Sequence, residues 1–254
     1  MFRVVQFNMQ FGQGWAEDPM PGVVDLNATL TEIKRHNADL IFLQEVERAQ
    51  PGGVQLQPPP NFTRLAAGLP GYHRYFAYPK ADPRELPFGV GLAIFSKTPL
   101  RNETRTDLPS PPIEFKFESF TTTPTDRLLI GARTTISGRE VQLFNTHLLA
   151  FFMLGTSSRE HPKQREIVAN AISSTAIGPT LLAGDFNVRG HGSLIAQFAR
   201  RGYLTVQSEE ITWRRQPHVL DHIFYNPYLR TLRHEVVPTM ASDHHLIVAD
   251  FEFA

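Results

Sequence analysis

The sequence of 254 residues contains no cysteine, so disulfide bonds and thiolate ligands for a metal are both excluded. It has 25 lysines and arginines against 25 aspartates and glutamates, so its formal net charge is zero. This balance argues against tight, non-specific binding to nucleic acid, which usually needs an excess of basic residues. A local basic patch is still compatible with it.

Long apolar segments are also missing. No apolar run approaches the ~20 residues that a membrane-spanning helix requires, so stable membrane insertion is not expected. The chain starts on MFRVVQFNMQF, which reads as a strand and lacks the basic and then apolar pattern of a secretory signal. We therefore expect a cytoplasmic protein, and we expect it to act as a monomer.

Strand-like and helix-like segments alternate along the chain, with turn residues between them. Apolar residues recur at helical spacing over residues 23–33, where Asp25 is a start signal, and over residues 159–174. Asn61 is predicted to cap a short helix, and Ser137-Gly138 to join two strands. With no repeat and no linker, the pattern predicts one domain over residues 1–254, with helices packed outside β-sheets.

Polar side chains stand where the strand-like runs begin or end. Those that follow such a run are Asn8, Glu45, His147, Asp185 and Asn187. Those that precede one are Asp221, Asp243 and His244. Because the end of one strand and the start of an antiparallel neighbour share an edge of the sheet, these side chains can converge on one rim.

These residue types suit the hydrolysis of a phosphoester. Carboxylate and amide oxygens are preferred ligands of Mg²⁺ or Mn²⁺, and such an ion offsets the negative charge of a phosphate. A carboxylate or histidine can deprotonate the attacking water, while other side chains donate to the charge that develops. Singly, each residue has a plainer explanation, such as a strand-end cap at Asn8 or a loop salt bridge at Glu45. Their joint occurrence at strand boundaries favours catalysis.

The motifs that contain these residues are FNM, LQE, NTHL, GDFN, LDHIF and SDHH, in this order over nearly the whole chain. The set resembles the endonuclease/exonuclease/phosphatase superfamily, which includes DNase I-like nucleases, AP endonucleases, inositol polyphosphate 5-phosphatases and sphingomyelinases. The resemblance implies an α/β fold, a four-layer sandwich with two central, mostly antiparallel sheets flanked by helices. It also implies metal-dependent hydrolysis of phosphoesters by in-line attack of water.

The resemblance implies a metal site as well. Glu45 would be the main ligand of Mg²⁺ or Mn²⁺, Asn8 would lie beside it and touch the metal or the phosphate, and Asp243 would lie near the metal. One position departs from the superfamily pattern, because Leu246 stands where a proline often follows the final histidine. This difference alters the turn without removing a functional group.

The same resemblance implies the catalytic residues. His147 would contact the scissile phosphate, and Asp185 and Asn187 would orient the water and stabilise the transition state. Asp221 would orient His244. Either Asp185 or His244 would take the proton of the water, and the motifs do not choose between them.

We therefore expect a metal-dependent phosphoester hydrolase, and in particular a phosphodiesterase. A nuclease acting on DNA or RNA and a lipid or inositol-type phosphatase are the alternatives. Phe151 and Phe152 follow NTHL, and they indicate either ordinary core packing or an apolar wall that favours a lipid-like substrate. A binding module without catalysis is the remaining class; it would be expected to lack Glu45, His147, Asp185 or His244, and all four are present.

Overall fold

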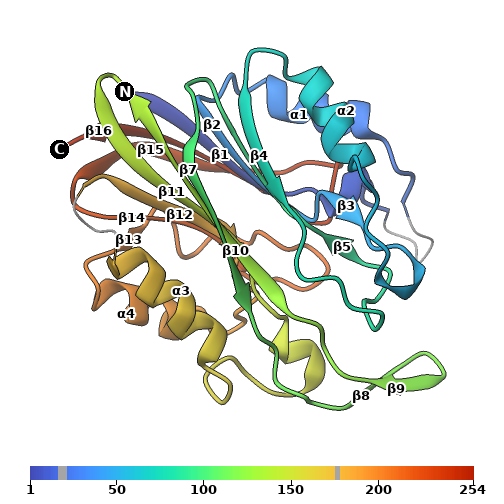
Figure 1. Cartoon of the computed structure of the whole chain (residues 1–254). Coiled ribbons are helices and arrows are strands. Elements are labelled where there is room, and N and C mark those ends of the chain that lie inside the picture. Colours follow the sequence, from blue (N-terminus) through green and yellow to red (C-terminus); the bar gives the residue numbers. More distant parts are fainter. Residues whose placement is uncertain (17–21, 175–177) are drawn as a thin grey trace.

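Two six-stranded β-sheets form the centre of the protein in a computed structural model, which describes residues 1–16, 22–174 and 178–254 (Figure 1). The first sheet contains, in spatial order, β15 (Leu229–Val237), β16 (Leu246–Phe253), β1 (Phe2–Asn8), β2 (Leu40–Gln44), β6 (Leu92–Ser96) and β4 (His73–Ala77). Strands β1 and β2 are parallel, and the other neighbouring pairs of this sheet are antiparallel.

The second sheet has the same design. It contains, in spatial order, β13 (Leu204–Thr205), β14 (Asp221–Tyr225), β12 (Thr180–Asp185), β11 (Arg139–His147), β10 (Arg127–Ile136) and β7 (Arg101–Leu108). Strands β11 and β12 are parallel, and the remaining neighbours are antiparallel. Ser137 and Gly138, both with positive φ, form the predicted turn between β10 and β11.

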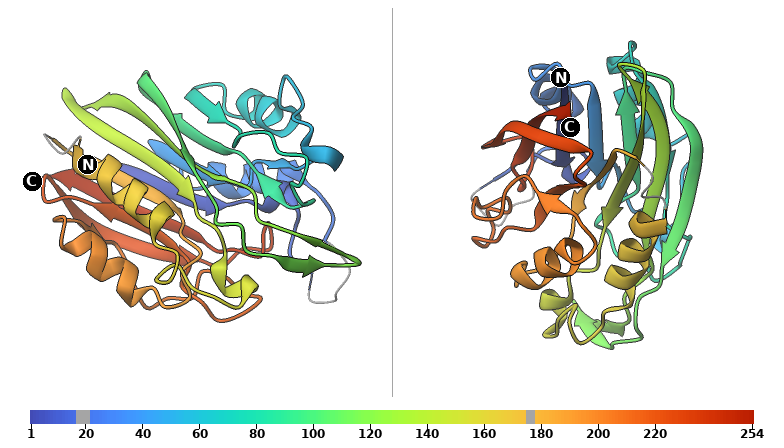
Figure 2. Two further views of the ribbon diagram at one scale, coloured as in Figure 1. Left: turned by 60° about the horizontal axis from the view of Figure 1, so that its bottom comes forward. Right: turned by 90° about the vertical axis from the view of Figure 1, so that its left-hand side faces the viewer.

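Helices cover the outer face of each sheet (Figures 1 and 2). The helices α1 (Leu26–Lys34) and α2 (Pro60–Gly68) pack on the first sheet, and α3 (Lys163–Ser174) and α4 (Gly192–Ala199) pack on the second. One apolar core lies between the two sheets, and another lies under each helix pair. The predicted four-layer α/β sandwich is therefore confirmed.

The start of α1 is as predicted, because the Asp25 side chain accepts hydrogen bonds from the backbone N–H groups of Asn27 and Ala28. Two other predictions are wrong in detail. Asn61 does not cap α2, which begins at Pro60; its amide instead donates to the carbonyl oxygens of Phe11 and Val46. Helix α3 begins at Lys163 rather than at residue 159, because a proline at position 162 disfavours helical backbone in the residue before it.

Short elements complete the chain. They are the strand pairs β3 (Glu47–Arg48) with β5 (Gly89–Val90) and β8 (Phe115–Phe117) with β9 (Phe120–Thr122), and the 3-10 turns Gln10–Gly12, Pro51–Gly53 and Phe151–Leu154. The β8–β9 hairpin projects from the body of the protein (Figure 1). Among the helices of the described residues, none has the length and hydropathy to cross a membrane.

Candidate active site

Strand pairing brings the predicted site residues to one edge of the two sheets. In the second sheet His147 is paired with Asp185, and Asp185 with Asp221; in the first, Asn8 is paired with Gln44, the residue before Glu45. A cleft of about 770 Å³ opens at this edge. Six of the eight predicted residues line it: Glu45, His147, Asp185, Asn187, Asp243 and His244. The other two, Asn8 and Asp221, are fully buried directly behind them.

One asparagine joins carboxylates that come from different sheets. The side-chain Nδ2 of Asn8 lies 3.0 Å from Glu45 Oε1 and 3.0 Å from Asp185 Oδ2. His147 Nε2 lies 3.9 Å from the same oxygen of Glu45 and 3.5 Å from the same oxygen of Asp185. Asn8 therefore sets the separation of the two carboxylates, and its own Oδ1 accepts from the backbone N–H of Gln10.

The backbone at Glu45 adopts a conformation that non-glycine residues rarely use, with φ of 51°. Its side chain passes over Gly89, where a Cβ atom would lie 2.3 Å from the Cβ of Glu45. Only a glycine at position 89 leaves room for this path. Strained backbone of this kind is typical of functional positions, where neighbouring structure holds it in place.

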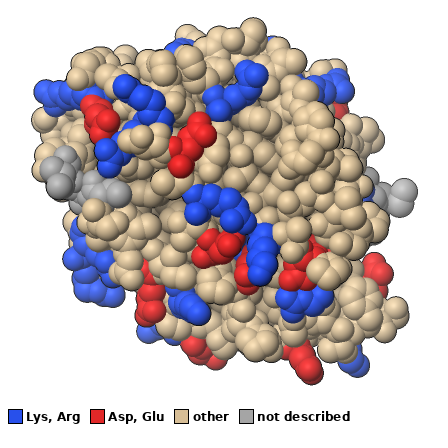
Figure 3. Space-filling model, viewed as in Figure 1, with Lys and Arg blue, Asp and Glu red and all other residues tan. Residues whose placement is uncertain are grey.

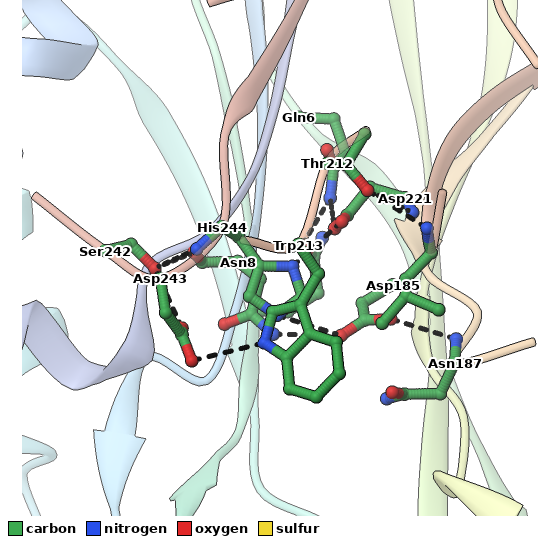
Figure 4. A network of polar contacts seen from close by, with 12 residues as sticks. Gln6, Asn8, Asp185, Asn187, Thr212, Trp213, Asp221, Ser242, Asp243 and His244 are labelled. Atoms are coloured by element: carbon green, nitrogen blue, oxygen red, sulfur yellow. Dashed lines mark hydrogen bonds and ion pairs between the residues drawn. The ribbon is translucent and has the colours of Figure 1, made fainter. Parts of the chain in front are cut away.

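A second pair of groups lies beside the carboxylates (Figure 4). Asp221 Oδ2 lies 2.8 Å from His244 Nδ1, and His244 Nε2 lies 3.7 Å from Asp185 Oδ2. Burial lowers the pKa of His244, but the charge and hydrogen bond of Asp221, together with Asp185 and Asp243, outweigh burial and raise it to about 10. The imidazole of His244 is therefore cationic at neutral pH and points its Nε2 toward Asp185.

Asp221 is fixed from several directions. Its Oδ1 accepts from Gln6 Nε2 at 2.9 Å, and its backbone N–H donates to Thr212 Oγ1 at 3.1 Å. Burial would raise the pKa of Asp221, but the adjacent His244 charge and these hydrogen bonds hold it below its usual value. Asp221 thus stays ionised and orients the imidazole.

A polar network leads from Asp221 into the space between the sheets. Gln6 Nε2 also donates to Gln44 Oε1 at 2.7 Å, and Gln44 Nε2 donates to Asn145 Oδ1 at 2.8 Å. Asn145 in turn donates to the backbone carbonyl oxygens of Leu43 and Ala93. The three amide side chains are completely buried, so these hydrogen bonds take the place of the hydrogen bonds to water that the amides would make in the unfolded chain.

The carboxylates that face the cleft have raised pKa values. Burial, with the charge of Asp243, raises the pKa of Glu45 to about 7, and burial, with the charge of Asp221, raises that of Asp185 to about 8. Ligand atoms of Glu45, His147 and Asp185 lie within 4.8 Å of one another. Burial, with the charge of Arg127, lowers the pKa of His147 to about 3, so its imidazole is neutral. This donor set fits a divalent cation, which would relieve the charge crowding of the carboxylates.

Asn187 is placed as the motif suggested, next to Asp185. Its backbone N–H donates to Asp185 Oδ1 at 2.9 Å, and its side chain donates to the Leu148 carbonyl oxygen at 3.0 Å. Asp243 lines the same cleft but is not part of the cluster formed by Glu45, His147 and Asp185, and its Oδ2 accepts from Trp213 Nε1 and Arg215 Nε. Its role as a metal neighbour stays a prediction.

Sequence reasoning missed several residues of the cleft, above all Arg127. Its Nε is buried with no hydrogen-bond partner in the described part of the chain, and Gln10 Oε1 is in the same condition; both residues line the cleft. Arg127 could not be recognised from the sequence because it is the first residue of a strand, β10, whose pattern of polar and apolar residues is ordinary. Trp213 and Arg215 lie in a loop without a motif.

Two histidines near the motifs are structural. The His222 ring is fully buried, lies against Phe186 and Phe224, and places Nδ1 3.1 Å from Thr205 Oγ1. His245 lies outside the cleft, next to Arg214. The position of His222 follows from strand alternation in β14, which turns neighbouring side chains to opposite faces.

Two stacked sheets with a carboxylate–imidazole cluster at one shared edge define the DNase I-like class of phosphoester hydrolase folds. The chain belongs to the endonuclease/exonuclease/phosphatase family, a model of which matches residues 5–244. Members of this family are hydrolases that act on phosphoesters.

Solved structures of family proteins share the fold. An endonuclease/exonuclease/phosphatase from Beutenbergia cavernae superposes with a TM-score of 0.73 at 22% identity, covering 100% of this chain and 72% of that one. A mannosyl-6-phosphatase from Bacteroides thetaiotaomicron gives 0.68 at 16% identity, with 100% of both chains covered. The human Nocturnin catalytic domain gives 0.64 at 21% identity, covering 100% of this chain and 93% of that one. A comparison with curated proteins found no match.

Proposed function

We propose that the protein is a divalent-metal-dependent phosphodiesterase. The observation that carries this proposal is the cluster of Glu45, His147 and Asp185 at one end of a cleft, with the Asp221–His244 pair directly beside it. Glu45 would bind Mg²⁺ or Mn²⁺ together with neighbouring oxygen atoms, and the bound ion would supply charge neutralisation for the phosphate.

The residues of this chain would do the remaining work. Asp185, held by Asn8 and by the Asn187 backbone, orients the water and accepts its proton. Cationic His244, oriented by Asp221, stabilises the negative charge that develops on the phosphate. The pKa values favour this division of roles only with a cation in place: His244 is already protonated and cannot act as the base, whereas the charge of a bound divalent ion would lower the raised pKa of Asp185 and leave it ionised. His147, which is neutral, donates to a phosphate oxygen.

The lining of the cleft favours one class of substrate over another. A nuclease would be expected to present a basic groove, but this cleft is lined by four arginines and five carboxylates: Arg48, Arg84, Arg127, Arg215, Glu45, Glu85, Glu118, Asp185 and Asp243. Basic and acidic side chains of the described residues are likewise interspersed on the face shown in Figure 3. The cleft walls include aromatic side chains, among them Phe88, Phe117 and Phe152. We therefore favour a small or lipid-like phosphodiester over a nucleic acid. We further propose that the enzyme acts as a monomer in the cytoplasm.

A substrate panel tests the proposal. We expect hydrolysis in Mg²⁺ or Mn²⁺ of one or more of an aryl phosphodiester, an aryl phosphomonoester, plasmid DNA, abasic DNA, RNA and sphingomyelin, with loss of activity on chelation. Glu45→Ala and His244→Ala should each reduce kcat/KM at least about 100-fold, because each removes a group needed in the transition state. Activity that survived both substitutions would refute this site.

A further inference from the structure

A second cavity of about 590 Å³ lies beside the catalytic cleft and shares Phe152 and Asn187 with it. Two loops form it, one between the Phe151–Leu154 turn and α3 and the other between β12 and α4. Its polar lining consists of Thr156, Ser157, Ser158, Arg159, Asn187, Arg189 and Ser193. The shared wall at Asn187, two residues after Asp185, places this cavity next to the reacting centre.

The charge of the cavity is positive. Arg159 and Arg189 contribute guanidinium groups, both residues are exposed, and no carboxylate is among the lining residues. The neighbouring acid, Glu160, is occupied by the hydroxyls of Thr156 and Ser157. Among the described residues no carboxylate pairs with either guanidinium group, and guanidinium groups with nearby hydroxyls are the donors that proteins use to bind phosphate.

A buried arginine supports this cavity from behind. Arg165 is only 5% exposed, and its guanidinium donates to Gln197 Oε1, to the hydroxyls of Ser158 and Ser193, and to the Ser193 carbonyl oxygen. In the described part of the chain no carboxylate pairs with it. Burying a cation without an anion is costly, and an anion bound in the adjacent cavity would offset part of that cost. Ser158 and Ser193, which accept from Arg165, both line the cavity.

We propose that this cavity, which we call the second anion site, binds a further phosphate group of the same substrate molecule. The inference rests on the proposed phosphodiesterase function and names its substrate class: a phosphodiester that carries a second phosphate a short distance from the scissile one. Asn187 lines both the catalytic cleft and the second anion site. One substrate molecule can therefore place its scissile phosphate in the cleft and its second phosphate in the neighbouring cavity, which favours a phosphate attached to the substrate over a free ion.

Two substrates that differ only in the second phosphate test this proposal. They are the p-nitrophenyl ester of thymidine 5′-phosphate, with and without a 3′-phosphate. We expect the wild-type enzyme to prefer the 3′-phosphorylated ester in kcat/KM by about tenfold at low ionic strength, as charge-assisted hydrogen bonds to one phosphate allow. In Arg159→Gln/Arg189→Gln this ratio should fall to about one, through a rise in KM for the 3′-phosphorylated ester.

A matched control removes two positive charges elsewhere. Lys34→Gln/Arg74→Gln changes exposed residues at the end of α1 and in β4, outside both cavities, and should keep the wild-type ratio. Equal kcat/KM for the two esters in the wild type, or an equal loss of preference in the control, would overturn the proposal.

Binding measurements separate this inference from the proposed function. If neither ester is hydrolysed, calorimetry with thymidine 3′,5′-bisphosphate and thymidine 5′-monophosphate still decides: tighter binding of the bisphosphate that depends on Arg159 and Arg189 supports the second anion site, and equal binding overturns it. Inorganic phosphate serves as a third ligand. Its arginine-dependent binding without any preference for the bisphosphate would assign the cavity to free phosphate and reject a substrate-borne group.

Discussion

The floor of the catalytic cleft is made of polar side chains from strand ends, whereas its walls are made of aromatic and arginine side chains from loops and short elements. On the floor, Glu45, Asp185 and His244 are each held by hydrogen bonds to neighbours from another strand or loop. On the walls, Phe88 and Met153 are 55% and 63% exposed. The floor is thus arranged before a substrate arrives, and the walls keep apolar surface open to it.

This difference separates the two tasks of the site. Groups that act on developing charge must be in place beforehand, since reorganising them during the reaction would cost free energy. Groups that select a substrate gain by being exposed, because covering their apolar surface contributes to binding. Changes to the floor should therefore reduce kcat, and changes to the walls should alter the choice among substrates.

The largest effect is expected at Asp221. Asp221→Asn removes the largest of the charges that hold the proton on His244, so burial is opposed only by Asp185 and Asp243 and the pKa of that histidine falls from about 10. We expect kcat to fall about 100-fold or more. The alkaline limb of the pH–rate profile should move to lower pH, because the imidazolium of His244 then loses its proton at a lower pH than in the wild type. The profile is measured with an aryl phosphodiester.

Circular dichroism of the same variant controls for misfolding. A folded Asp221→Asn protein with an unmoved alkaline limb would show that His244 does not act as a cation, and the roles of Asp185 and His244 would have to be exchanged.

An intermediate effect is expected from Gln44, which lies behind the floor. Gln44→Leu leaves Asn145 Oδ1 without its donor and deprives Gln6 of one acceptor, so Asp221 is less firmly positioned. We expect a loss of about 1–3 kcal/mol in the free energy of unfolding and a decrease in kcat of roughly tenfold. Denaturant unfolding and steady-state kinetics measure the two effects.

Gln142→Leu is the matched control for this variant. Gln142 lies in β11 and donates to the Ala132 carbonyl oxygen, without contact to the network at Asp221. It should lower stability and leave kcat unchanged. Equal kcat values for the two variants would mean that Gln44 has only a structural role.

The smallest effect is expected on the walls. Phe151 is buried and stacks on His161, so it belongs to the core, whereas Phe152 lines the cleft and lies 5.8 Å from the Trp213 ring. Phe152→Ser should change the ratio of kcat/KM for sphingomyelin to that for an aryl phosphodiester by about threefold to tenfold, through lost apolar contact. Tyr228→Ser, an exposed aromatic outside the cleft, is the control. An unchanged ratio in Phe152→Ser would exclude an apolar wall.

The sequence allowed the fold and the floor of the site to be predicted for the same reason. The site residues stand in short motifs at the ends of strands, where they can be recognised locally. Strand pairing, such as that of His147 with Asp185, then brings the side chains of separate motifs together. The polar network was not predictable in this way. Gln6 and Gln44 stand inside strands, where a polar residue usually indicates a solvent-facing position, and the bond from Gln6 to Asp221 spans 215 residues.

The walls and the second anion site could be predicted least. Arg159, Arg165 and Arg189 belong to separate loops and a helix, and nothing in their local sequence indicates a shared cavity. Loop conformation depends on contacts between distant segments rather than on periodicity. The late start of α3 at Lys163 is a smaller case, since one proline overruled an otherwise helical pattern.

The pairing of β1 with β16 affects how the protein folds during its synthesis. Asn8 leaves the ribosome long before His244 and the strand that follows it, residues 246–253, which are added more than two hundred residues later. Until then one edge of β1 has no partner, and the carboxylates of Glu45 and Asp185 have no cation from His244 beside them. A nascent chain therefore exposes an open strand edge until β16 has been made, and the floor of the cleft is complete only when that strand closes the first sheet.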